Sequence, residues 1–200
     1  MQRDIKMNRF LDMIMEKILS GGWAEEKDAE IIRYGLELNI MKTLISAAML
    51  IAAFALKSAP AVIVFMLIYP PMRSCCGGYH ARTRTACFIS SMGILAAVIA
   101  ASKFITGKAA FYASAAMLIA GAAFVAVLAP VEALKKPFDD VERRVFRRRS
   151  LLVTAVSSAV CMLLALLKLY SFMLPAATAV FFTGIFLVVG KLSLRKGAVK

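Results

Sequence analysis

Apolar and polar positions divide the chain into six hydrophobic segments separated by short, mostly basic stretches. The segments cover residues 36–56, 58–72, 87–106, 109–129, 151–169 and 171–190. Because a helix rises about 1.5 Å per residue, about 20 apolar residues are needed to cross a bilayer core about 30 Å thick. We therefore predict an all-α polytopic membrane protein with about six transmembrane helices. A four-span arrangement, in which 43–72 and 151–190 form re-entrant hairpins, is the alternative.

The second hydrophobic segment, 58–72, is the shortest, and it ends at Pro70-Pro71-Met72. At helical rise it covers only about 22 Å of the bilayer core. We expect this span to end inside the headgroup boundary, so that the stretch after it begins in a depression of the membrane surface.

A stripe of apolar residues also precedes the first segment, at the spacing of one helix face. We predict an amphipathic interfacial helix within a cytoplasmic stretch over 1–34, ended by Gly21-Gly22. Its apolar stripe contacts either lipid or the protein's own cytoplasmic face. The stripe consists of Met7, Phe10, Leu11, Ile14, Met15, Ile18 and Leu19.

Composition and charge agree with a membrane protein and orient it. The chain is 61% hydrophobic and 18% charged, whereas soluble domains carry about 25% charged residues. We read residues 1–200 as one membrane domain. Most basic residues fall in 1–34, 73–86, 130–150 and after 190. By the positive-inside rule these stretches are cytoplasmic, as are both termini.

The loop that follows the second segment holds the residues with the most reactive chemistry. His80 is the only histidine in the chain, and Gly77-Gly78 lie just before it. Cys87 follows His80 seven residues later. A cysteine becomes a nucleophile when positive charge, a helix N-terminus or a histidine base favours its thiolate. The stretch 73–86 contains three arginines. It is therefore a candidate catalytic loop at the cytoplasmic face.

The spacing of His80 and Cys87 constrains this hypothesis. Residues seven apart share a helix face but lie about 10.5 Å apart along the axis of one straight helix. Proton transfer requires a distance of about 3 Å between the thiol sulfur and the imidazole nitrogen. We therefore predict a loop or bend through His80 that folds back over the first turn of the helix carrying Cys87.

Two other interpretations of these residues stay open. An interfacial histidine and a cysteine at a helix start are often only structural. A metal site formed by His80, Cys87, Cys75 and Cys76 has enough ligands but no recognisable zinc spacing. We expect neither a metal nor a cofactor. The four cysteines also do not form a disulfide framework.

The same segment resembles the accessory gene regulator B (AgrB) family of membrane endopeptidases from Gram-positive quorum sensing. The resemblance rests on Arg73 seven residues before His80, Gly78 two before it, and the His-x6-Cys spacing to Cys87. Further matches are Tyr34-Gly35-Leu36-Glu37, Ala129-Pro130 and Lys135-Lys136-Pro137. Together and in this order they cover nearly the whole chain.

The resemblance implies a cysteine endopeptidase that removes the C-terminal part of an AgrD-like precursor peptide and promotes its closure to a thiolactone or lactone. By position, Cys87 is then the nucleophile and His80 the general base. Arg73 and Gly78 support the site, and Gly77 belongs to the segment whose N–H groups are candidates for oxyanion stabilisation.

The basic stretch 130–150 has two interpretations. Positive charge there is explained by topology and by contact with anionic lipid. In the terms of the family it is also a docking surface for an acidic precursor, steered by the net charge of +13. The residues are Lys135, Lys136, Arg143, Arg144, Arg147, Arg148 and Arg149.

The remaining partners follow from composition. We expect a lipid bilayer and no nucleic acid. Small residues such as Gly121 permit either a homodimer or internal helix packing. The competing class of function is a non-enzymatic membrane transporter or scaffold, which would tolerate loss of Cys87 and His80.

Overall fold

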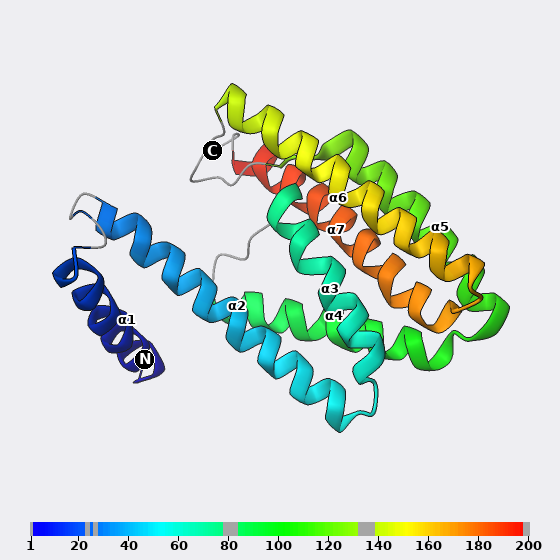
Figure 1. Ribbon diagram of the computed structural model, residues 1–200, viewed down its shortest axis with the longest axis horizontal. Helices are drawn as coiled ribbons and strands as arrows, with labels where there is room; N and C mark the ends of the chain where they lie inside the picture. The colour runs from blue at the N-terminus through cyan, green and yellow to red at the C-terminus, as the bar shows by residue number, and fades with distance from the viewer. Residues whose placement is uncertain (1, 23–24, 26–27, 78–83, 132–138, 198–200) are drawn as a thin grey trace. The chain divides into compact units, whose positions relative to one another are not determined.

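The computed structural model describes residues 2–22, 25, 28–77, 84–131 and 139–197. Over these residues the chain forms seven helices and no strand (Figure 1). All but the first are long and apolar enough to cross a membrane. The protein is therefore an all-α polytopic membrane protein, as predicted. The helices are α1 (Gln2–Ser20), α2 (Ala29–Ala55), α3 (Ala59–Cys76), α4 (Arg84–Phe104), α5 (Gly107–Leu128), α6 (Asp140–Leu166) and α7 (Tyr170–Gly197).

The structure comprises two compact units, residues 1–48 and 49–200. The first holds α1 and the beginning of α2. In it, two residues of the predicted apolar stripe, Leu11 and Met15, are buried. Asp12 on the polar side of α1 forms an ion pair with Arg33 of α2, with 2.9 Å between nitrogen and oxygen. Part of the stripe is thus covered by protein.

In the second unit α7 is the central helix. Every residue from Met173 to Val180 is buried, and 61% of its most apolar stretch is buried, against 17–22% for the other five candidate spans. α7 contacts α5 most extensively, followed by α3, α6 and α4. The other helices therefore keep most of their apolar surface for lipid.

Close packing of α5 on α7 depends on two glycines. A Cβ on Gly121 would lie 2.8 Å from backbone atoms of Val180 and Phe181. A Cβ on Gly184 would lie 3.2 Å from the Gly121 Cα. Small residues let membrane helices approach until their backbones touch. Gly121 thus serves packing inside the protein.

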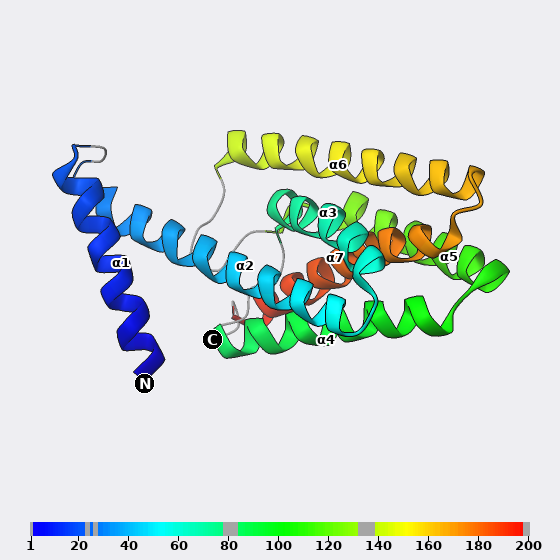
Figure 2. The same ribbon diagram turned by 60° about the horizontal axis from the view of Figure 1, so that its bottom comes forward.

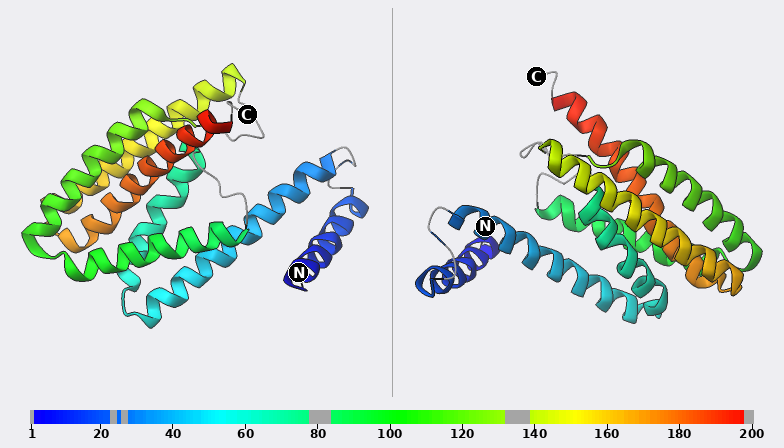
Figure 3. Two further views of the ribbon diagram at one scale, coloured as in Figure 1. Left: turned by 180° about the vertical axis from the view of Figure 1, so that it is seen from behind. Right: turned by 45° about the horizontal axis from the view of Figure 1, so that its top comes forward.

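Short turns join the helices at one end of this unit. Both panels of Figure 3 show the α4–α5 and α6–α7 turns at the same end of this unit. Lys57, after α2, and Lys168, after α6, have positive φ angles of 53° and 58°. In both turns the following N–H bonds a carbonyl five residues back, at 2.8 Å for Ser58 and 2.9 Å for Leu169. These bonds satisfy carbonyls that a helix end leaves without partners.

Candidate active site at the end of α3

α3 continues through Pro70 and Pro71 to Cys76, whereas the apolar pattern predicted an end at Met72. Proline restricts the residue before it and removes one N–H, but it does not prevent the residues after it from being helical. Both prolines are exposed on the outer side of α3. The first part of the predicted loop is therefore helical, and the longer α3 does not support a depression caused by a short span.

Gly77 ends α3 in a conformation that requires glycine. Its φ is 71°, and a Cβ there would lie 2.3 Å from the carbonyl oxygen of Val131. The Gly77 N–H donates to the Arg73 carbonyl at 3.2 Å, and the Val131 N–H donates to the Cys76 carbonyl at 3.1 Å. Gly77 is thus held against the chain that leaves α5. Its N–H already has an acceptor, so it is not a free oxyanion donor.

The Arg73 side chain is fixed by contacts on three sides. Its guanidinium donates to the Gly77 carbonyl and hydrogen-bonds the Tyr69 hydroxyl. It also lies over the Phe186 ring of α7, with 4.9 Å from the guanidinium carbon to the ring centroid. Such cation–π contacts are favourable when partly desolvated. The arginine therefore has a defined position at the end of α3.

Cys87 lies in the first turn of α4 and is half-buried. Its thiol interacts electrostatically with the Tyr69 hydroxyl of α3. Its carbonyl accepts from the hydroxyls of Ser90 at 3.0 Å and Ser91 at 2.9 Å. The N-terminal turn of a helix carries partial positive charge, so the backbone places that charge near the thiol.

Tyr69 interacts with both Arg73 and Cys87. It was not among the site residues predicted from the sequence. It stacks on the buried Phe65 ring with centroids 4.8 Å apart, and its hydroxyl hydrogen-bonds Arg73 and interacts electrostatically with Cys87. The available signal was its position four residues before Arg73, which places both side chains on one face of α3. Phe186 had no comparable signal, because α7 is far away in sequence.

Several predicted site residues lie outside the described residues. They are His80, Gly78, Lys135 and Lys136. The dyad geometry and the bend between His80 and Cys87 therefore stay predictions, and so does the metal alternative that needs His80. Among the described residues no three of His, Cys, Asp and Glu come together as metal ligands.

From Asp140 onward the basic stretch is helical, and one of its arginines caps the end of α5. α6 begins at Asp140, where the side chains of Asp139 and Glu142 form a capping box. Arg147 donates to the carbonyls of Ala129 at 3.0 Å and Ala126 at 3.3 Å, at the C-terminal end of α5. Arg148 and Arg149 are exposed. Of the predicted docking set, Arg147 therefore has a structural role.

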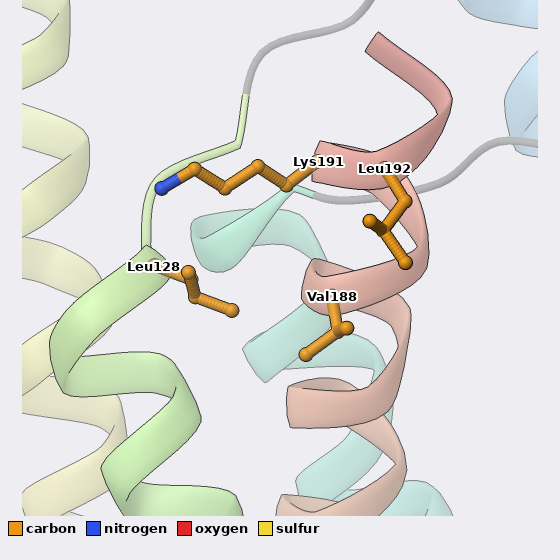
Figure 4. Close-up of a pocket in the computed structure, with 4 residues that line it drawn as sticks. All are labelled: Leu128, Val188, Lys191 and Leu192. Carbon is orange, nitrogen blue, oxygen red and sulfur yellow. The ribbon is translucent and has the colours of Figure 1, made fainter. Parts of the chain in front are cut away.

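A hydrogen bond and a small hollow lie at the same end of the bundle. The Ser150 hydroxyl lies 2.9 Å from the carbonyl of Cys75, which joins α6 to the end of α3. A small hollow of about 240 Å³ lies between Leu128 of α5 and Val188 and Leu192 of α7. Figure 4 shows Lys191 extended across it toward the chain that leaves α5. Cationic side chains near a helix C-terminus are favourable.

A comparison with known protein families matches residues 8–189 to AgrB, Accessory gene regulator B. The chain belongs to the AgrB family. Membership implies involvement in the processing of the accessory gene regulator autoinducer, the general role of AgrB proteins. The resemblance noted from Arg73, Gly78, His80 and Cys87 is thus confirmed over most of the chain. No curated protein and no solved structure matched in the corresponding comparisons.

Proposed function

We propose that the protein is a membrane-embedded cysteine endopeptidase. It removes the C-terminal part of an AgrD-like propeptide and promotes cyclisation of the remainder to a thiolactone or lactone. Beyond family membership, one observation supports this proposal most. Cys87, in the first turn of α4, interacts electrostatically with Tyr69, which hydrogen-bonds Arg73, and Arg73 is held over the Phe186 ring.

The reaction proceeds in two acyl transfers. His80 accepts the proton of Cys87, and the thiolate attacks the scissile carbonyl. The carbon–nitrogen bond breaks as the imidazolium returns its proton to the leaving amine, and an acyl-thioester remains on Cys87. A thiol or hydroxyl of the precursor then attacks this thioester, closes the ring and releases Cys87. Exclusion of water favours cyclisation over hydrolysis.

The orientation of the chain follows from its charges. Both termini and the site face the cytoplasm, where the exposed basic residues of α6 meet the acidic part of the precursor. A test of precursor docking should leave Arg147 unchanged, because its guanidinium hydrogen-bonds the Ala129 carbonyl at the end of α5. Neutralising Arg143, Arg144 and Arg148 should make processing less salt-sensitive without changing membrane insertion.

The proposal is tested by expressing the chain with a candidate precursor, the short peptide encoded beside its gene, and measuring cleavage by mass spectrometry. Cys87→Ala and His80→Ala should each lower cleavage by at least about 100-fold, the usual contribution of a positioned base or nucleophile. A covalent acyl-enzyme should be trapped on Cys87.

Cys161→Ala is the matched control, because Cys161 is buried in a separate cluster with Met173, Ala176 and Ala177. It should retain cleavage. If Cys87→Ala cleaves as well as Cys161→Ala does, the cysteine mechanism is wrong, and a transporter or scaffold role becomes the better explanation.

A further inference from the structure

A groove of about 590 Å³ runs between α3 and α6, which lie side by side in the second unit (Figure 2). Its lining is apolar except for Ser157, whose hydroxyl donates to the Val153 carbonyl at 2.8 Å. Leu67, Leu152 and Val156 line it and are 70%, 60% and 55% exposed. The groove therefore offers apolar contact and no unmet hydrogen bond.

The dimensions of the groove match one leaflet of a bilayer. Along α6 its lining extends from Leu152 to Leu164, which is about 18 Å at 1.5 Å per residue. Half of a hydrocarbon core of about 30 Å is about 15 Å. The lining is therefore about as long as the acyl region of one leaflet is thick.

Positive charge stands at the polar end of the groove. Arg149 precedes the lining residue Val153 by four positions and Val156 by seven, so it lies on the same face of α6. Arg148 precedes Leu152 by four. Both arginines are exposed, and α6 carries no charged residue after Arg149. A phosphate at the level of the headgroups would meet them.

We propose that this groove binds one anionic phospholipid, with an acyl chain between α3 and α6 and its phosphate at Arg149. The charge complementarity and the length of one leaflet both select this occupant. Because the groove shares α3 with Arg73 and Tyr69, bound lipid packs against the helix that carries the candidate active site.

The test uses the purified full-length chain and native mass spectrometry, with phosphatidylglycerol and phosphatidylcholine of identical acyl chains as probes. One phosphatidylglycerol should be retained in preference to phosphatidylcholine. Arg149→Gln should reduce this retention by about fivefold, the effect of one cation near a lipid surface. Arg144→Gln is the matched control, since Arg144 lies more than one turn farther than Arg149 from the lining residues and bonds the Asp140 carbonyl. It should retain binding.

A groove-filling variant tests the acyl chain. Val156→Trp should abolish retention, whereas Val127→Trp, at an exposed valine of α5 outside the groove, should not. Leu152→Trp is a second filling variant if Val156→Trp fails to fold. Equal retention of both lipids, or equal loss in both valine variants, would overturn the proposal. The proposal would also be overturned if the protein were a dimer and Val156→Trp dissociated it. A second copy of the chain, and not a lipid, would then cover the groove.

Loss of precursor cleavage in Val156→Trp with unchanged lipid retention would also overturn it, by assigning the groove to the precursor.

Discussion

At the scale of single residues, Tyr69 and Arg73 explain how a charged group is held at the end of an apolar helix. They lie one turn apart on α3, and the arginine also contacts Gly77 and Phe186. A buried or half-buried cation is costly unless it is paired or hydrogen-bonded. Tyr69 supplies one of these bonds and also interacts electrostatically with Cys87, so it links the arginine to the proposed nucleophile.

Tyr69→Phe keeps the ring that stacks on Phe65 and removes the hydroxyl. Loss of one hydrogen bond to a charged group costs about 1.5 kcal/mol, so precursor cleavage should slow by about tenfold. The rate at which iodoacetamide alkylates Cys87, measured by peptide mass spectrometry, should change in the same variant. Tyr112→Phe, at an exposed tyrosine of α5, is the control, and equal rates in the two variants would contradict a role for Tyr69.

Gly77→Ala tests the conformation that ends α3. The added Cβ meets the Val131 carbonyl oxygen, and the positive φ itself costs about 1 kcal/mol for alanine. The temperature at which helical circular dichroism is lost should fall by several degrees.

Gly93→Ala provides the matched comparison, because a Cβ at Gly93 in α4 meets open space. Alanine is the better helix former by about 1 kcal/mol, so this variant should be as stable as the wild type or more so. Equal destabilisation in the two glycine variants would show that the Gly77 contact does not matter.

At the scale of elements, the ends of helices carry much of the organisation. α3 ends against Val131, α5 ends against Arg147, and α6 begins with its own capping box. Each of these devices satisfies backbone groups that a helix end leaves without partners. The polar end of the bundle is thereby ordered without a sheet or disulfide among the described residues.

Arg147→Gln should destabilise the protein, because glutamine is too short to reach both carbonyls at the end of α5. Part of the site is solvent-exposed, so the free energy of unfolding should fall by about 1 kcal/mol. Thermal unfolding in detergent measures it. In lipid-free detergent, Arg149→Gln removes the same charge two positions away and should unfold at the wild-type temperature; matched losses in both would point to net charge instead of the cap.

At the scale of the whole molecule, the length of the apolar segments predicted the fold class. Contact with lipid requires each span to be nearly uniformly apolar, so the segments stand out in the sequence. The positions of helix ends were harder to predict. Continuation of α3 past Pro71 and the start of α6 at Asp140 depend on capping and on contacts with other helices. Local hydropathy contains neither kind of information.

The candidate site was predictable where its chemistry is encoded by residue type. A single histidine, a cysteine seven residues later and a preceding arginine could be read directly from the chain. Phe186, Val131 and Ser150 could not, because they reach the end of α3 from distant helices. Tyr69 is intermediate, since its spacing from Arg73 was visible but its approach to Cys87 required the packing of α4 on α3.

The pairing of Gly77 with Val131 also has a mechanical consequence. The stretch that carries His80 departs from the first of these residues, and the stretch that carries Lys135 and Lys136 departs from the second. The hydrogen bond from the Val131 N–H to the Cys76 carbonyl holds these two points of departure side by side. Under the proposed function, a substitution at Gly77 should therefore affect peptide docking and catalysis together, because both stretches are anchored to this one backbone pair.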